Sequence, residues 1–364
     1  MTSSKVSPPE GFDLPPGPIL VTGCAGFIAS RVVQLLLDRG RCVVGIDNLN
    51  DAYDPALKRH RLAKLQPLAG FSFRPVDICS RREVEKLFDA PTEGPADRQS
   101  SNPAPFAAVV NLAARAGVRP SVEDPWIYFQ TNCEGALNLL DACRAHGVRK
   151  YVLASTSSLY GAHNALPYSE DADTNRPLSP YAASKKAAEA ACYSYHHLHG
   201  LDVTIFRYFT VFGPAGRPDM SVFRFVRWIA EGEPILVFGD GSQSRDFTYV
   251  DDIARGTVAG LRPTGYEIIN LGSDSPVELR QVIAWVGELL GAEPQVVCRP
   301  AHPADVPATW ANVEKARRLL GWRPEVSVRE GLARCVEWYK THREFARLVE
   351  LNETVRSGSL THGR

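Results

Sequence analysis

The sequence of 364 residues has no apolar run that approaches the ~20 residues of a transmembrane helix, so we expect no membrane span. It has no excess of charge of either sign, because 41 Lys and Arg stand against 41 Asp and Glu, and neither sign forms a long block. A polyanion such as a nucleic acid is therefore not an expected partner.

The eight cysteines lack both the CxxC pairing and the spacing of metal ligands. They are Cys24, Cys42, Cys79, Cys133, Cys143, Cys192, Cys298 and Cys335. We interpret them as core residues in a reducing compartment, and expect neither a disulfide nor a metal site. Residues 1–17 lack the apolar core of a signal peptide and are rich in Pro, Ser and Gly, which predicts a flexible N-terminal lead-in and a cytoplasmic protein.

Short apolar runs alternate with segments of helical periodicity through the first two hundred residues. The runs that we interpret as strands are Ile19–Thr22, Cys42–Ile46, Phe71–Phe73, Ala108–Leu112, Tyr151–Leu153 and Val203–Phe206. Between the first two, residues 28–38 place their apolar side chains on one helix face, and Gly40 follows as a stop signal. The alternation predicts an α/β protein with a Rossmann-type, doubly wound parallel sheet.

The pattern changes after about Thr210, where Pro, Gly and polar loops interrupt shorter elements as far as a helix around 330–343. We therefore expect a nucleotide-binding domain at 18–209 and a smaller, partly interleaved substrate-binding lobe at 210–345. Residues 346–364 are expected to form a tail, and the Pro- and Ser-rich segment 90–105 a surface loop.

The first predicted strand leads into the turn "TGCAGFIA", residues 22–29. Gly23 and Gly26 would let backbone amides approach a pyrophosphate, and the dipole of the following helix favours that anion. The third position of this fingerprint is Ala29 rather than Gly, and Ala still permits close packing of helix and strand. The turn predicts a dinucleotide site.

A carboxylate, Asp47, closes the second strand. In such sites this carboxylate accepts hydrogen bonds from the adenosine ribose and repels a 2′-phosphate, which predicts NAD rather than NADP; a helix cap is the alternative role. Asp77 follows the next strand and is expected beside the adenine amino group, with a solvated turn residue as the alternative. The predicted cofactor-binding residues are Gly23, Ala25, Gly26, Phe27, Ile28, Asp47, Asn48, Asp77, Ile78, Leu112, Ala113, Ala114, Tyr181, Lys185 and Tyr208.

A tyrosine and a lysine with helical spacing, Tyr181 and Lys185 in "YAASK", would share one helix face. An unperturbed phenol has a pKa near ~10. A neighbouring ammonium and a positively charged nicotinamide would favour the phenolate, so that the pair could act as a base at neutral pH. The strand end "LASTSSLYG" adds three hydroxyls, on Thr156, Ser157 and Ser158, and no carboxylate.

With these motifs the sequence resembles the extended short-chain dehydrogenase/reductase superfamily and, within it, the UDP-glucuronate 4-epimerases. The resemblance extends from Ile19 to about Tyr339. Four segments resemble sequence motifs of this family: "IDNLNDAYDPALKRHRL", "NLAARAGVRPSVEDP", "YFTVFGPAGRPDM" and "FGDGSQSRDFTYVDD".

The resemblance implies roles for individual residues. Tyr181 would be the catalytic base and acid, Lys185 would hold the nicotinamide ribose, and Thr156 would hydrogen-bond the sugar 4-hydroxyl with Ser157 and Ser158 beside it. Thr210 and Arg217 would hold the uronate carboxylate, although Arg217 could instead be a solvated loop charge.

The resemblance also implies a nucleotide end of the substrate site. Phe238 would lie by the uracil, Arg245 on the diphosphate and Asp305 on the uridine ribose; Arg299 and His302 lie nearby without an assigned role. The alternatives are a core aromatic for Phe238 and a surface ion pair for Arg245.

Relatives that go beyond ketone formation carry an acid at this strand end: the 4,6-dehydratases have Thr-Asp-Glu, and the UDP-glucuronate decarboxylases have a Glu where this chain has Ser158. The missing acid predicts oxidation and re-reduction at C4 alone. We therefore expect UDP-glucuronate to be converted to UDP-galacturonate through a transient 4-keto sugar, with tightly bound NAD⁺.

Several alternatives remain open. A UDP-glucose or UDP-N-acetylglucosamine 4-epimerase would share every catalytic residue, whereas a decarboxylase or dehydratase is disfavoured by the missing acid. A non-catalytic NAD(H)-binding regulator is disfavoured by the intact Tyr181, Lys185 and Thr156. The helices around 128–146 and 181–199 match those that pair in homodimers of the superfamily, although their apolar faces could also be ordinary core.

Overall fold

The centre of the protein is a parallel sheet of seven strands in the order β11-β6-β5-β4-β1-β2-β3. A computed structural model describes residues 14–90, 104–301 and 305–351 of the chain, and within them every pairing in this sheet is parallel. The strands are β1 Ile19–Thr22, β2 Val43–Asp47, β3 Phe71–Pro75, β4 Ala108–Asn111, β5 Lys150–Thr156, β6 Asp202–Tyr208 and β11 Tyr266–Leu271. The Rossmann-type fold predicted from the alternating pattern is confirmed.

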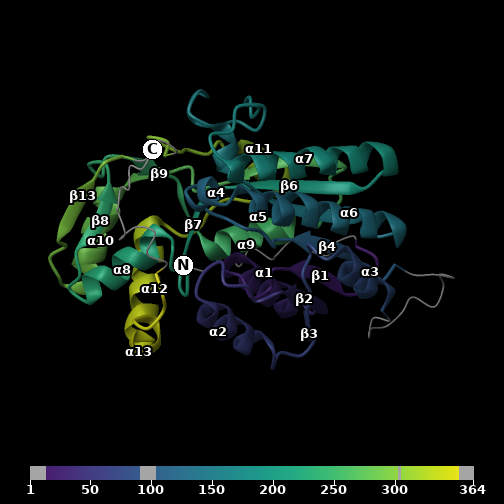
Figure 1. Cartoon of the computed structure of the whole chain (residues 1–364), viewed down its shortest axis with the longest axis horizontal. Helices are drawn as coiled ribbons and strands as arrows, with labels where there is room; N and C mark the ends of the chain where they lie inside the picture. Colours follow the sequence, from purple (N-terminus) through teal and green to yellow (C-terminus); the bar gives the residue numbers. More distant parts are fainter. Residues whose placement is uncertain (1–13, 91–103, 302–304, 352–364) are drawn as a thin grey trace, which may run out of the picture.

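Helices cover both faces of this sheet, which explains why β1, β2 and β4 are largely apolar and buried at every position, whereas the edge strand β3 is only partly buried. Successive side chains of a strand point to opposite faces, so Ile19 and Val21 pack with α1 (Phe27–Asp38) and α9 (Val250–Ala259). Leu20 between them packs on the other face, with α3 (Arg81–Asp89), α6 (Gly135–Ala145) and α7 (Pro180–His199). Figure 1 shows α6 and α7 on the side of the sheet opposite α1.

A second, smaller layer of structure lies at one end of the molecule, at the left in Figure 1. There β8 (Ile235–Phe238) pairs with β13 (Val296–Arg299) in parallel, beside α8 (Ser221–Ala230), α10 (Leu279–Leu290) and α12 (Val328–Thr341). A separate core cluster holds these elements together. Between this lobe and the sheet lie two short pairs, β7 (Thr210–Phe212) with β10 (Phe247–Tyr249), and β9 (Ser244–Arg245) with β12 (Val277–Glu278).

The chain leaves the smaller lobe and returns to the main sheet, where β11 pairs with β6. The remaining elements are α2 (Pro55–Leu65), α4 (Pro120–Glu123), α5 (Pro125–Phe129), a π-helical turn at Gln130–Glu134, a 3₁₀ turn at Ser157–Tyr160, α11 (Glu314–Leu320) and α13 (Arg343–Ala346). Most of the predicted lead-in and surface loop, His302, and residues 352–364 of the predicted tail lie outside the described residues. Within the described ranges no helix combines the length and the hydropathy that a membrane crossing needs.

Candidate active site

A cavity of about 440 Å³ runs along the carboxyl edge of the sheet and reaches the smaller lobe. Because the strands are parallel, all their carboxyl ends meet at this edge, which is where ligands bind in such folds. The predicted residues that line the cavity are Gly23, Gly26, Phe27, Ile28, Asp47, Asn48, Asp77, Ile78, Leu112, Ala113, Ala114, Thr156, Ser157, Ser158, Tyr181, Lys185, Tyr208, Thr210, Arg217, Arg245 and Asp305. Two predicted residues, Ala25 and Phe238, are not part of the lining.

The turn after β1 is shaped by the absence of side chains. A Cβ on Gly23 would lie 2.9 Å from Ala113 Cα, and Gly23 has a φ of +66°, so a larger residue would both clash and be strained. A Cβ on Gly26 would lie 2.8 Å from the Gly23 carbonyl. The buried Thr22 hydroxyl donates to Asn111 Oδ1 at 2.7 Å and fixes the ends of β1 and β4 side by side. This backbone cradle, followed directly by the N-terminus of α1, fits the pyrophosphate of a dinucleotide.

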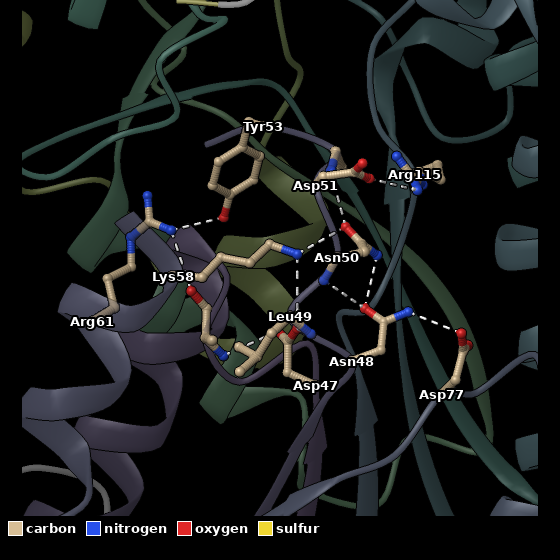
Figure 2. A network of polar contacts seen from close by, with 12 residues as sticks. Asp47, Asn48, Leu49, Asn50, Asp51, Tyr53, Lys58, Arg61, Asp77 and Arg115 are labelled. Carbon is tan, nitrogen blue, oxygen red and sulfur yellow. Dashed lines mark hydrogen bonds and ion pairs between the residues drawn. The ribbon is translucent and has the colours of Figure 1, made fainter. Parts of the chain in front are cut away.

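The carboxylate of Asp47 is buried at the end of β2, where backbone N–H groups hold it (Figure 2). Its oxygens accept from Ala25 N at 3.2 Å and from Leu49 N at 2.8 Å. Ala25 therefore positions Asp47 instead of lining the cavity. The ammonium of Lys58, on α2, lies 3.7 Å from Asp47 Oδ1, a neighbour that the sequence interpretation missed.

The second predicted adenosine-binding carboxylate, Asp77, accepts from Asn48 Nδ2 at 3.0 Å and from Cys79 N at 2.9 Å. Burial acts to raise the pKa of Asp77, but these hydrogen bonds outweigh it and lower the pKa, so the group is a carboxylate at neutral pH. Asp47, Asn48 and Asp77 together form a hydrogen-bonding wall of the cavity.

At the opposite side of the cavity, the end of β5 brings the hydroxyl cluster to the start of α7. Thr156 Oγ1 lies 3.2 Å from both the Ser158 hydroxyl and the Ser158 N–H. Ser179 caps α7 by accepting from Ala182 N at 3.2 Å, which places Tyr181 in the first turn of the helix. Burial raises the pKa of Tyr181, while a hydrogen bond with Thr156 and the charge of Arg217 act in the opposite direction.

The ammonium of Lys185 donates to the Ala154 carbonyl at 2.8 Å. Burial lowers the pKa of Lys185 to about 8, although the carboxylate of Glu189 raises it. Thr156 and Arg217 are thus groups that favour the Tyr181 phenolate in this structure, and the contribution expected of Lys185 together with the nicotinamide stays a prediction. The lysine is anchored between β5 and α7.

A buried ion pair joins α7, the helix that carries Tyr181 and Lys185, to β6, and was not predicted from the sequence. Arg207 on β6 donates to Glu189 from Nη2 at 2.9 Å and from Nε at 3.1 Å, and both side chains are 2% exposed. Ser155, the neighbour of Thr156, also donates to Glu189 at 2.6 Å. Glu189 thereby connects β5, β6 and the helix that carries Tyr181 and Lys185.

Arg217 lies in the cavity near Tyr181, but Asp219 occupies much of its guanidinium. Arg217 Nε donates to Asp219 Oδ1 at 3.0 Å, and Nη2 contacts both Asp219 and the Ala116 carbonyl. Burial acts against the charge of Arg217, yet Asp219 outweighs burial and raises the pKa of the guanidinium. Among the described residues Nη1 has no hydrogen-bond partner, so this amino group is available to a ligand.

The uridine end differs in detail from the expectation. Phe238 is covered by the guanidinium of Arg119, which lies 3.9 Å from the ring centre and explains why Phe238 does not line the cavity. Arg119 Nη2 also donates to Asp305 at 2.6 Å. Arg245 lines the cavity with Asp305 and donates to the Ser244 carbonyl at 2.8 Å, whereas Arg299 is exposed at the end of β13.

Two cavity neighbours that were not predicted, Lys58 and Arg119, belong to sequence segments on which the family resemblance rests. Lys58 lies in "IDNLNDAYDPALKRHRL" and Arg119 in "NLAARAGVRPSVEDP". Their charge alone gave no signal, because exposed Lys and Arg are common on helices and loops. Only the fold shows that Lys58 is 5% exposed and contacts Asp47.

Comparison with known proteins agrees with this geometry. The chain is 50% identical over 336 residues to a UDP-glucuronate 4-epimerase of Thermodesulfobacterium geofontis, which covers 92% of this chain and 100% of that protein. The UDP-glucuronic acid 4-epimerase of Bacillus cereus, solved with UDP-glucuronic acid and NAD, superposes with a TM-score of 0.80 at 35% identity over 89% of this chain and 99% of that one. A UDP-glucose 4-epimerase of Thermotoga maritima, solved with UDP-glucose, gives a TM-score of 0.79 at 30% identity over 90% and 99%.

The family model that matches residues 19–272 starts at β1 and ends after β11, so it spans the whole of the central sheet and its cavity-lining edge. The chain belongs to the NAD dependent epimerase/dehydratase family.

Proposed function

We propose that the protein is a UDP-glucuronate 4-epimerase that converts UDP-glucuronate to UDP-galacturonate through a transient 4-keto sugar. The observation that carries the proposal is the hydroxyl cluster of β5, which faces Tyr181 without a carboxylate. Among the residues that the structure describes, the acidic ones that line the cavity are Asp47, Asp77 and Asp305, and none of them belongs to this cluster. Relatives at 50% and 35% identity bear the name UDP-glucuronate or UDP-glucuronic acid 4-epimerase.

The cavity residues divide the work of proton transfer and positioning. When bound, NAD would supply the hydride acceptor and donor for C4 of the sugar. Tyr181 removes the proton of the 4-hydroxyl and returns it after the flat 4-keto ring has presented its other face. Thr156, which hydrogen-bonds the phenol, is assigned to the sugar 4-hydroxyl, and Lys185 is assigned to the nicotinamide ribose.

The absence of an acid beside Thr156 limits the reaction to C4. A dehydratase must remove the proton at C5, and a hydroxyl such as that of Ser157 or Ser158 is too weak an acid or base for that step. The 4-keto uronate is a β-keto acid that tends to lose carbon dioxide, so its carboxylate has to be held while the ketone exists. The Nη1 group of Arg217 and the hydroxyl of Thr210 are the donors that we assign to it.

A UDP-glucose or UDP-N-acetylglucosamine 4-epimerase would use the same catalytic groups. The partly buried guanidinium of Arg217 favours the uronate, because neither of those sugars offers it a carboxylate.

The function is tested by replacing Tyr181 with Phe. We expect turnover of UDP-glucuronate to fall by several orders of magnitude, because the remaining phenyl ring cannot take a proton, while UDP and NAD still bind. Tyr195→Phe, on the same helix but outside the cavity, is the matched control and should keep its turnover. Activity of Tyr181→Phe within a few-fold of the parent would remove Tyr181 from the mechanism.

A homodimer and a cytoplasmic location belong to the same proposal. Large apolar side chains are exposed on the helices expected to pair, with Leu137 43% exposed on α6 and Tyr193 54% exposed on α7. Trp126, on α5 just before the expected range 128–146, is 82% exposed. All eight cysteines are free, as is usual in a reducing compartment. Sedimentation should show a dimer for the parent and a monomer for Trp126→Arg if these helices form the interface.

The division of labour along the chain is also proposed. Residues 18–209 supply the NAD site, and residues 210–345 supply mainly the UDP-sugar site. The position of Arg217, Arg245 and Asp305 on the side of the cavity formed by the later part of the chain supports this division.

A further inference from the structure

A buried ammonium lies beside the carboxylate that is expected to bind the adenosine ribose. Lys58 projects from α2 toward the loop that follows β2, and its nitrogen points between Asp47 and Asn50 (Figure 2). Lys58 Nζ donates to Asn50 Oδ1 at 2.9 Å and lies 3.7 Å from Asp47 Oδ1. The Lys58 side chain is 6% exposed, and both Lys58 and Asp47 line the cavity.

The ammonium is not fully satisfied by the protein. It has three N–H groups, of which one is bonded to Asn50 and a second faces Asp47. Within the described part of the chain no third acceptor is within hydrogen-bonding distance. Burial lowers the pKa of Lys58, Asp47 raises it, and the nearby cations Arg115, Arg61 and Arg217 lower it further. A buried charge with a free donor is expensive, which favours a ligand as the third acceptor.

The carboxylate of Asp47, in contrast, cannot move to give Lys58 a closer contact without loss of other bonds. Its two oxygens are bonded to the N–H groups of Ala25 and Leu49. The pair is therefore a fixed arrangement in which a cation and an anion stand side by side at the adenosine end of the cavity.

We propose that Asp47 and Lys58 together recognise the adenosine ribose. Lys58 binds the cofactor, and the negative charge of Asp47 is the one group that excludes a 2′-phosphate. In NAD sites an acidic residue at this strand end accepts hydrogen bonds from the ribose hydroxyls. In NADP sites, where the acid is missing, a nearby cation binds the 2′-phosphate. This chain has both groups within 3.7 Å. Preference for NAD thus depends on one negative charge, and the cation needed for NADP is already in place.

This inference rests on the NAD site and not on the identity of the sugar. Its test is consequently a binding measurement that does not depend on epimerase turnover, with NAD binding by the parent as an independent check of the site itself.

The experiment compares the parent with Asp47→Asn, Lys58→Met and the double variant. Asn keeps an acceptor oxygen for only one of the two backbone N–H groups, those of Ala25 and Leu49, that bond to Asp47. The double variant leaves no unpaired buried charge, and the fold of each variant is verified by circular dichroism. Should Asp47→Asn not fold, Asp47→Ser serves in the same comparison. Lys64→Met, a loss of an exposed lysine from the same helix, is the control for net charge.

Affinity is measured by displacement of NADH, followed by its fluorescence, with NAD, NADP, AMP and adenosine 2′,5′-bisphosphate as competitors. We expect Asp47→Asn to bind NADP and the bisphosphate roughly tenfold to a hundredfold more tightly than the parent, the range of one charge-assisted contact. Addition of Lys58→Met to Asp47→Asn should abolish that gain. Lys58→Met alone should bind NAD less tightly than the parent, whereas Lys64→Met should have neither effect. The proposal is overturned if Asp47→Asn gains no affinity for NADP, or if the double variant retains the gain.

Discussion

Replacement of Glu189 by Gln removes the negative charge from the ion pair between α7 and β6 and preserves the shape of the side chain. Glu189 and Arg207 are each 2% exposed, and Arg207 donates to both carboxylate oxygens. Loss of one partner leaves the other charge buried and unpaired, which typically costs about 3–5 kcal/mol. Because the shape is kept, no cavity contributes to this cost, and Gln can still accept from Ser155.

The second variant in this series, Glu189→Gln with Arg207→Met, removes the stranded cation. Its remaining losses include the Arg207 hydrogen bonds to Tyr160 Oη at 3.2 Å and to the Glu170 carbonyl at 3.0 Å, and the contact of the guanidinium with the Tyr160 ring, 5.0 Å from the ring centre. At about 1 kcal/mol for each bond, the double variant should be about 1–2 kcal/mol less stable than the parent. The second substitution is therefore expected to restore stability.

Urea denaturation at pH 7, followed by tryptophan fluorescence and circular dichroism, measures these differences. Turnover provides a second measurement, because Glu189 raises the pKa of Lys185 and its loss should shift the alkaline limb of the pH profile to lower pH. If the double variant is no more stable than Glu189→Gln, the unpaired charge of Arg207 is not what destabilises the single variant, and the interpretation is refuted.

Three further predictions concern the carboxylate site and the response to pH. Arg217→Ala should reduce UDP-glucuronate turnover far more than UDP binding and should release decarboxylated product, detected by NMR; unchanged turnover would contradict the carboxylate role. Since the pKa of Lys185 is lowered to about 8, kcat should fall as pH rises through that value, and a profile flat to pH 10 would exclude this lysine as the titrating group. Burial lowers the pKa of His60 from 6.5 to about 4. Between pH 6.5 and about 4 the unfolded chain therefore binds a proton that the folded chain does not, so the free energy of unfolding should fall as the pH drops through this range. The urea midpoint of His60→Phe should fall less over the same range, and an equal fall in the variant would contradict this.

Much of the cofactor end could be predicted from the sequence because its signals are local. Gly23 and Asp47 each stand at the end of an apolar run, and parallel strands bring such ends to one edge. The boundaries of β5 and β6 were less predictable. Lys150 and Arg207 belong to these strands although they are charged, because Lys150 pairs with Asp202 on the neighbouring strand β6 and Arg207 pairs with Glu189 on α7.

Contacts between distant segments could not be predicted in the same way. The stacking of Arg119 on Phe238 joins the Rossmann-type sheet region to the smaller lobe, and neither residue signals the other in the sequence. The pairing of Arg217 with Asp219 is close in sequence, yet a guanidinium expected to bind the substrate gave no reason to look for an internal partner. In both cases the position of a charge is decided by burial, which only the packed structure determines.

The most direct test of the proposed function is a time course of the purified protein with UDP-glucuronate, followed by NMR without added NAD. The proposal predicts a mixture of UDP-glucuronate and UDP-galacturonate, with no carbon dioxide released and with little or no conversion of UDP-glucose in a parallel sample. A UDP-pentose, a lasting 4-keto product or unchanged UDP-glucuronate would contradict epimerisation, and conversion of UDP-glucose at an equal rate would contradict the uronate assignment.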